Sequence, residues 1–387
     1  MPQTIAVLGA GTMGSGIAQV AATYNHDVIL YEPHKEVLDY SRKNLTRILN
    51  RQIEKGRMTS EQVNGILGRI SSVTELKYIK QADLVIEAII EDTEIKKDLY
   101  QEVEPFVSED AIIATNTSSL SIASLTNAFN KPERFLGIHF FNPAPLMPLV
   151  EIIPSVLTKD EVTNSARELI DSWDKTTVLA KDLPGFIVNR IARPFYGEAL
   201  RILEEGIADV ATIDKAMKEI GGFRMGPFEL MDFIGNDVNQ KVSETVFEAF
   251  YYDPRFRPSL TQKRMAEAGL LGRKSETGFY DYREGAENPV TADDEQLSRQ
   301  IAARIITMLI NQAADACWLN VATKDEIDLA MTKGVNYPKG LLAWADELGA
   351  QEVVNRMDAY YDYYREERYR CCPLLKDMAA SGEKFFG

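Results

Sequence analysis

The stretch Thr4-Ile-Ala-Val-Leu-Gly9-Ala-Gly11-Thr-Met-Gly14 joins a short apolar run to three closely spaced glycines. The glycines have the spacing G-x-G-x-x-G, and a helical pattern over Thr12–Ala22 follows them. We expect Gly9 to allow a tight turn, Gly11 to let a pyrophosphate approach the backbone, and Gly14 to let the helix pack closely on the strand. The stretch therefore predicts a strand–turn–helix unit that binds a dinucleotide at the helix N-terminus.

The preferred cofactor is indicated by Glu32, which ends a second apolar run, Asp27–Tyr31, at roughly the twenty-residue spacing expected of such a unit. A carboxylate at this position accepts hydrogen bonds from the ribose hydroxyls of NAD and repels the 2′-phosphate of NADP. We therefore expect NAD. The alternative is a glycine-rich turn in an α/β fold that binds no cofactor.

Short apolar runs alternate with helical patterns through the first half of the chain, which predicts a doubly wound sheet of largely parallel strands. The candidate strands are Thr4–Leu8, Asp27–Tyr31, Leu84–Ile89, Ala111–Thr115, Phe135–Phe140, Leu149–Ile153 and Thr177–Ala180. Strand patterns fade after Gly185, and a polar segment near 283–289 separates two helical regions. The prediction is an α/β Rossmann-type NAD-binding domain over 1–183 followed by all-α C-terminal domains over 184–285 and 286–387.

Composition limits the classes of partner. The net charge of −15 argues against nucleic acid as a partner, because binding phosphates requires a surplus of Lys and Arg. No apolar run is long enough to span a bilayer, and the first residues do not resemble a signal peptide. The three cysteines lack metal-ligand spacing and are too few for a disulfide framework, so we expect no metal and a reducing, cytoplasmic location.

His139 and Glu151 are the candidate catalytic residues. Of three histidines, His26 and His34 flank a predicted strand and are expected at the surface, whereas His139 ends an apolar run before a proline-rich turn. Glu151 lies inside the apolar run Leu149–Ile153 and needs a partner if it is buried. A carboxylate on one imidazole nitrogen fixes the tautomer and stabilises the cation that forms when the other nitrogen takes a proton. A hydrogen-bonded core histidine and a solvent-facing Glu151 are the alternatives.

A series of motifs occurs in order along residues 1 to 283, and it resembles the 3-hydroxyacyl-CoA dehydrogenase family. The motifs are Gly9–Gly14, Asp83-Leu-Val-Ile-Glu-Ala88, Thr115-Asn-Thr-Ser118-Ser119, His139-Phe-Phe-Asn142-Pro143, Leu149-Val-Glu151, Pro184-Gly-Phe-Ile-Val-Asn189-Arg190, Met225-Gly-Pro-Phe-Glu-Leu230 and Gly278-Phe-Tyr-Asp-Tyr282.

The resemblance implies roles for individual residues. His139 would be the general base for the 3-hydroxyl proton and Glu151 would orient it, while Ser118 and Asn189 would hold the substrate oxygen and the histidine geometry. The residues implied around the dinucleotide are Gly9, Gly11, Thr12, Met13, Gly14, Glu32, Glu91, Lys96, Asn116 and Asn142. Ser118 and Asn116 could instead cap the next helix, and Lys96 could be a solvated helix residue.

A basic stripe, defined here as Lys43, Arg47, Arg51 and Lys55, recurs every four residues on one helical face. Like charges at this spacing repel, so the stripe in an acidic protein suggests an anionic ligand such as the phosphates of CoA. A solvated face is the alternative. The family resemblance implies CoA contacts from a Ser and a Lys, and this chain has Asn44 and Arg51 at the matching positions.

An internal repeat links the two helical regions. Residues Ile213-Asp214, Ala216-Met217, Gly226, Asp232 and Gly235 recur at one constant offset as Ile327-Asp328, Ala330-Met331, Gly340, Asp346 and Gly349, and Arg190 matches Arg304. Asn189 corresponds to Ala303, so we expect the second copy to be structural. The family resemblance implies that single-copy members form dimers through this domain. The two copies here would then form an intrachain pseudo-dimer with an apolar contact that includes Ile305, Ile306, Leu309 and Leu319. A further homodimer stays open.

The predicted activity is NAD-dependent oxidation of a 3-hydroxyacyl-CoA, a step of fatty acid β-oxidation. The alternatives are a non-catalytic, crystallin-like NAD-binding relative and another β-hydroxyacid dehydrogenase, such as the 6-phosphogluconate type. The sequence does not identify the acyl group of the substrate. The segment from Asp237 to Pro258 resembles the 3-hydroxyadipyl-CoA subgroup, and 3-hydroxybutyryl-CoA is an equal candidate.

Overall fold

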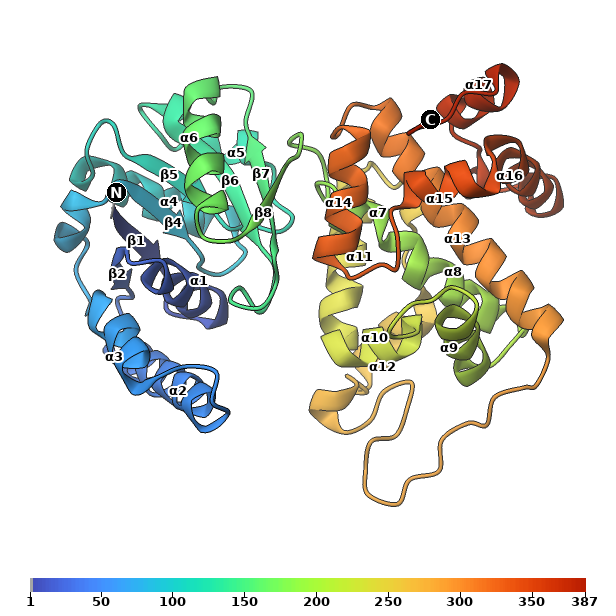
Figure 1. Cartoon of the computed structure of the whole chain (residues 1–387), viewed down its shortest axis with the longest axis horizontal. Helices are drawn as coiled ribbons and strands as arrows, with labels where there is room; N and C mark the ends of the chain where they lie inside the picture. Colours follow the sequence, from blue (N-terminus) through green and yellow to red (C-terminus); the bar gives the residue numbers. More distant parts are fainter. Residues whose placement is uncertain (1–2) are drawn as a thin grey trace. The chain divides into compact units, whose positions relative to one another are not determined.

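The computed structural model describes residues 3–387, which form two compact units that divide between Leu183 and Pro184 (Figure 1). The first unit is a sheet flanked by helices, and the second is built from helices.

The first unit contains one eight-stranded sheet with the order β3-β2-β1-β4-β5-β6-β7-β8. Its strands are β1 (Thr4–Leu8), β2 (Asp27–Tyr31), β3 (Ile70–Val73), β4 (Leu84–Glu87), β5 (Ile112–Thr115), β6 (Phe135–Phe140), β7 (Leu149–Pro154) and β8 (Thr176–Leu179). Neighbouring strands are parallel except β6 and β7, which are antiparallel. The predicted α/β Rossmann-type class is confirmed.

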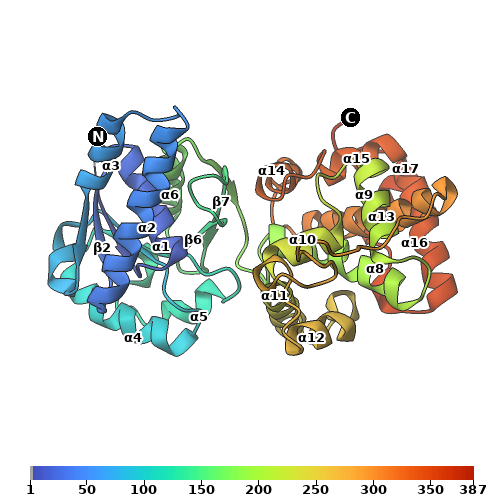
Figure 2. The ribbon, with the colours of Figure 1, turned by 90° about the horizontal axis from the view of Figure 1, so that it is seen from below.

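Helices cover both faces of this sheet. They are α1 (Thr12–Thr23), α2 (Lys35–Glu54), α3 (Ser60–Arg69), α4 (Thr93–Val103), α5 (Ile122–Thr126) and α6 (Asp160–Asp171). Because successive strand residues point to opposite faces, Ile5 and Val7 share one core with α1, α3 and α6, while Ala6 and Leu8 point to the other face. Figure 2 shows α4 and α5, which contact each other, below the sheet.

The seven predicted strands are all present, with ends that shift by one or two residues. The sequence did not indicate β3, because Ile70-Ser-Ser-Val73 is short and lies at an edge of the sheet. Both of its serines are exposed, so the run lacks the continuous hydrophobicity of a central parallel strand.

His26 corrects one prediction, since it is buried rather than at the surface, whereas His34 is exposed. Its Nδ1 lies 3.1 Å from the Gln3 amide nitrogen and its Nε2 lies 2.9 Å from Trp173 Nε1, and a neutral imidazole accepts a hydrogen bond at one of these two nitrogens. Trp173 is itself fully buried between the sheet and α6. Burial lowers the pKa of His26. The partner of His26 lies 147 residues away, which explains why local sequence did not reveal it.

The second unit packs around one long helix, α13 (Glu295–Trp318), which contacts α8, α9 and α15 to α17 (Figure 1). The other helices are α7 (Val188–Ile191), α8 (Arg193–Glu204), α9 (Val210–Glu219), α10 (Pro227–Ile234), α11 (Asn236–Ala249), α12 (Leu260–Glu267), α14 (Lys324–Gly334), α15 (Leu341–Leu348), α16 (Ala350–Tyr364) and α17 (Pro373–Ser381). Ile305, Ile306 and Leu309 are buried, but Leu319 is 43% exposed after the end of α13, so its expected place in the apolar contact was wrong.

The same local geometry occurs in both copies of the predicted repeat. The Asp214 carboxylate accepts from the amides of Phe228 and Glu229, and the Asp328 carboxylate accepts from those of Leu342 and Ala343. A Cβ on Gly226 would lie 2.3 Å from Asp214, and one on Gly340 would lie 2.1 Å from Asp328. Each aspartate therefore binds backbone amides in the first turn of the next helix, and each glycine leaves room for the aspartate side chain.

Acid should destabilise the first unit through His26. An imidazolium accepts no hydrogen bond, so protonation would lose the one that the neutral ring accepts and would place a second ring N–H against the N–H groups of Gln3 and Trp173. Because the folded pKa is lowered, its stabilising contribution is present above the ordinary value of 6.5 and is lost as the pH falls through the folded pKa. The thermal midpoint should fall more steeply below pH 6.5 in the wild type than in His26→Gln, with His34→Gln as the control. Equal slopes in all three proteins would refute this assignment.

Candidate active site

The structure brings His139 and Glu151 into contact. They lie directly opposite each other in the antiparallel pair of β6 and β7, and His139 Nδ1 is 2.7 Å from Glu151 Oε2. Glu151 has no accessible surface and His139 is 5% exposed. The prediction that the strand of Glu151 folds back beside His139 is confirmed, and the solvent-facing alternative for Glu151 is wrong.

The geometry assigns different tasks to the two imidazole nitrogens. Because Nδ1 of His139 is held by the carboxylate, Nε2 is the ring nitrogen that could exchange a proton with a bound molecule. The turn between the strands is fixed by Lys175, whose Nζ donates to the carbonyls of Ala144 and Met147 over 2.6 and 2.9 Å. Burial lowers the pKa of Lys175. The sequence analysis did not single out this lysine.

Asn116 and Ser118 follow β5, beside the end of β6. Asn116 Oδ1 accepts the amide of Phe140 over 2.8 Å, which ties the two strand ends together next to His139. The Ser118 amide donates to Glu91 Oε1 over 3.0 Å. The next helix, α5, is capped by Ser121, so the capping alternative for Asn116 and Ser118 was wrong.

Glu91 clamps the loop that carries Ser118. Its Oε1 accepts from Thr117 Oγ1 over 2.6 Å and from Ser119 Oγ over 3.0 Å, and its Oε2 is 3.4 Å from Lys96 Nζ. Burial raises the pKa of Glu91, but the charge of Lys96 and these hydrogen bonds outweigh it and hold the pKa below its ordinary value. The carboxylate therefore stays ionised and keeps the loop in one conformation.

A buried ion pair lies beneath this loop. Lys96 is 1% exposed, so the solvated alternative for it was wrong, and its Nζ is 2.6 Å from Glu87 Oε1. Glu87 is fully buried and also accepts from the hydroxyls of Tyr100 and Thr115. Burial and the charge of Glu87 raise the pKa of Tyr100 well above its ordinary value. Glu87 was missed by the sequence analysis, although a carboxylate in an apolar strand was the signal that identified Glu151.

The glycine-rich turn fits a dinucleotide. Gly9 has a φ of +100°, and a Cβ there would lie 2.7 Å from the Ala88 carbonyl oxygen. A Cβ on Gly14 would lie 1.9 Å from the Gly9 carbonyl oxygen, so the helix could not approach the turn. Open space lies over Gly11, and no side chain caps the N-terminus of α1. Its first amides can therefore bind a pyrophosphate, as the sequence predicted.

Glu32 lies at the same edge of the sheet. Its Oε2 is 3.4 Å from the amide of Ala10 in the glycine turn, and its Oε1 accepts from the His34 amide over 3.3 Å. The carboxylate thus lies where a ribose would follow the pyrophosphate. Thr12, at the start of α1, is exposed, and Met13 is half-buried. Asn142 is exposed and follows the end of β6, which carries His139.

The remaining predicted residues belong to α2 and to the second unit. Lys43, Asn44, Arg47 and Arg51 lie on α2, where the three basic side chains are exposed and Arg47 donates to Asn44 Oδ1 over 2.6 Å. Asn189 belongs to α7 of the second unit. Within residues 3–387 no group of His, Cys, Asp and Glu side chains could hold a metal ion, and no helix is long and apolar enough to cross a membrane.

The chain matches two family models. The model of the 3-hydroxyacyl-CoA dehydrogenase NAD-binding domain matches residues 4–183. The model of the C-terminal domain of the same family matches residues 185–282 and 301–384.

Two named relatives and one solved structure are similar to this chain. The chain is 37% identical to 3-hydroxyadipyl-CoA dehydrogenase of Escherichia coli K12, with 97% of each chain covered. It is 41% identical to a probable 3-hydroxybutyryl-CoA dehydrogenase of Deinococcus radiodurans, which covers 71% of this chain with 99% of its own length. A crystal structure titled 3-hydroxybutyryl-CoA dehydrogenase from E. coli K12 superposes with a TM-score of 0.93 at 36% identity, covering 99% of both chains.

Removing the charge of Lys96 should destabilise the first unit. Lys96→Met leaves the Glu87 carboxylate buried without its cation, which typically costs about 3–5 kcal/mol. The control Lys97→Met removes a lysine whose partner Glu94 is 79% exposed, and it should change stability by less than about 1 kcal/mol. The double variant Glu87→Gln/Lys96→Met should recover part of the loss. Urea unfolding monitors all three, and equal stability of the two single variants would contradict the buried pair.

Proposed function

Because the chain belongs to the 3-hydroxyacyl-CoA dehydrogenase family, we propose that His139 is its general base and that Glu151 positions it. Bound NAD supplies the acceptor for the hydride of substrate C3. The hydroxyl proton on that carbon passes to Nε2 of His139. The buried 2.7 Å contact between His139 Nδ1 and Glu151 carries this proposal.

Glu151 acts by holding one tautomer. Its carboxylate has no accessible surface, so its position relative to the imidazole is set by the sheet rather than by solvent. A carboxylate that accepts from Nδ1–H leaves Nε2 as the basic nitrogen, and it stabilises the imidazolium that proton transfer creates.

Ser118 and Asn189 are the proposed ligands of the substrate oxygen. The Ser118 backbone is fixed by Glu91, so its hydroxyl is presented from a rigid loop at the carboxyl end of β5. Ligands bind outside the carboxyl ends of strands in sheets of this kind. For Asn189 the proposal rests on the matching family motif Pro184–Arg190.

We propose that some of these residues contact the cofactor and that others fix the loops around it. Gly9 to Gly14 and Glu32 would bind the pyrophosphate and a ribose, and Asn142 lies exposed beside His139 for the nicotinamide end. Lys96 and Glu91 contribute by fixing the loop over Thr117–Ser119, because their charged groups contact each other. Asn116 acts similarly through its bond to Phe140.

We propose that the basic stripe binds the phosphates of the CoA moiety. Arg47 and Arg51 are exposed and lie one turn apart on α2. Neither forms an ion pair among the described residues, and nearby like charges repel until an anion neutralises them.

For the acyl group we propose the two classes that the relatives' names give, 3-hydroxybutyryl-CoA and 3-hydroxyadipyl-CoA. A panel of hydroxyacyl-CoA substrates, compared by kcat/KM, would separate a short neutral chain from one that ends in a carboxylate.

We further propose that the two helical copies form an intrachain pseudo-dimer. Arg190 of the first copy donates to Asp315 of α13 over 2.8 Å, and its counterpart Arg304 donates to Glu198 of α8 over 3.0 Å. Each of these arginines thus pairs with an acidic residue on a helix of the other copy, so buried ion pairs join the two copies. The second copy has Ala303 where the first has Asn189, which supports a structural role for it.

Replacing the base should separate turnover from cofactor binding. His139→Gln should lower kcat by roughly a hundredfold or more, because it removes the general base. NADH binding, followed by fluorescence titration, should be unchanged, because the imidazole does not belong to the glycine turn. His34→Gln is the matched control, since its side chain is 69% exposed. Near-normal turnover of His139→Gln would eliminate His139 as the base.

Reversing charge on the basic stripe should affect substrates that carry the distal CoA phosphates. Arg47→Glu/Arg51→Glu should raise KM for 3-hydroxybutyryl-CoA several-fold, because the stripe would then repel an anion. KM for the corresponding pantetheine thioester should change little. Lys241→Glu/Arg264→Glu is a charge-matched control on the second unit, where both residues are exposed. An equal rise for both substrates would show that the stripe is a solvated face.

A further inference from the structure

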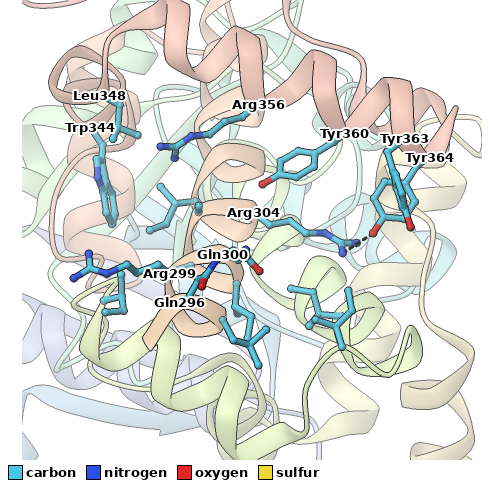
Figure 3. Close-up of a pocket in the computed structure, with 18 residues that line it drawn as sticks. Gln296, Arg299, Gln300, Arg304, Trp344, Leu348, Arg356, Tyr360, Tyr363 and Tyr364 are labelled. Carbon is cyan, nitrogen blue, oxygen red and sulfur yellow. Dashed lines mark hydrogen bonds between the residues drawn. The ribbon is translucent and has the colours of Figure 1, made fainter. Parts of the chain in front are cut away.

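A cavity of about 790 Å³ lies in the second unit, within the size range of small-molecule sites. The first helical copy contributes Ile202, Ile207 and Ile220, and the second contributes residues of α13, α15 and α16 (Figure 3). Ala303, the counterpart of Asn189, lines it. The cavity therefore includes the position that corresponds to Asn189, where the second copy has an alanine.

The charge of the lining is unusual for this protein. Three arginines line the cavity, namely Arg299, Arg304 and Arg356, and none of its lining residues is acidic, although the whole chain has a net charge of −15. A cationic wall in an acidic protein selects for an anion.

The three arginines are not equivalent. Arg304 is 7% exposed and donates to Glu198, Glu205 and the tyrosines at 364 and 369, so it forms a neutralised wall of the cavity. Arg299 and Arg356 pair only with neighbours on their own helices, and their acidic partners are 73% and 48% exposed. Exposed pairs of this kind contribute little, so both guanidinium groups can turn to a ligand at small cost.

Apart from Gln296, Gln300 and the hydroxyls of three tyrosines, the rest of the lining is apolar. Leu297, Ile301, Ile306 and Leu348 join the three isoleucines of the first copy. Ile207 and Ile220 are 42% and 37% exposed, so the cavity leaves apolar surface in contact with water. In Figure 3 the side chains of Arg299 and Arg356 lie on the same side of the cavity as the Trp344 ring, and Tyr360 and Tyr364 lie on the other side.

We propose that this cavity binds an amphiphilic carboxylate, that is, an acyl chain that ends in a carboxylate. The chain lies along the isoleucines, where burial of apolar surface stabilises it. The carboxylate accepts hydrogen bonds from Arg299 and Arg356, which offer the fork-shaped donors that match its geometry. All residues that line this cavity belong to the second unit, whereas the glycine turn and His139 belong to the first.

Calorimetry on the full chain tests the proposal with three probes of equal chain length: decanoate, decanol and decyltrimethylammonium. Decanoate should bind and the cation should not. The double variant Arg299→Gln/Arg356→Gln should weaken decanoate binding about tenfold or more, as expected for the loss of charge-assisted hydrogen bonds. Arg365→Gln is the control, because this arginine is 70% exposed and does not line the cavity.

A second variant fills the cavity. Ala303→Phe should abolish decanoate binding while NADH binding and the thermal midpoint stay close to those of the wild type. Equal affinity for decanol and decanoate, or unchanged affinity in the double arginine variant, would overturn the proposal. No binding of decanoate at submillimolar concentration would also overturn it. So would a lower molecular mass in solution for Ala303→Phe than for the wild type, because the cavity would then be an interface between copies of the chain.

Discussion

The contact between His139 and Glu151 is the constraint on which the site depends. A carboxylate without accessible surface is stable only beside a partner, and the antiparallel register of β6 and β7 supplies that partner directly opposite. A slip of one residue would turn the two side chains to opposite faces of the sheet. The antiparallel pairing of β6 and β7, and the turn held by Lys175, therefore place one imidazole beside its carboxylate.

Buried charges also fix the loops around this imidazole. Glu87 and Lys96 link β4 to α4, Glu91 holds the loop after β5, and Asn116 joins that loop to the end of β6. The carboxyl ends of three neighbouring strands are thus connected by side-chain bonds rather than by backbone pairing alone. A site built this way is preorganised, because its loops do not have to be ordered when substrate binds. In the second unit, Asp214 and Asp328 each accept backbone amides at the start of a helix.

Local patterns predicted the parts of the structure that local physics determines. The glycine turn, the central strands and the buried Glu151 follow from spacing and hydrophobic period, and the constant offset of two Gly and two Asp residues indicated the repeated geometry. The missed features depend on distant partners: His26 is buried because Trp173 packs on it, and Lys96 is buried because Glu87 and Glu91 surround it. The edge strand β3 was missed because half of it faces solvent. The position of Asn116 against Phe140 could not be read from a sequence in which 24 residues separate them.

The central claim is that His139 and Glu151 act as one unit, and a double-mutant cycle in kcat tests it most directly. Three variants are compared with the wild type at saturating substrate and NAD: His139→Gln, Glu151→Gln and the double variant. If Glu151 acts only through the imidazole, the double variant should be no slower than His139→Gln alone, as residues that act together show non-additive losses. If instead the two losses multiply, or if Glu151→Gln turns over at the wild-type rate, the two residues act independently and the account is contradicted.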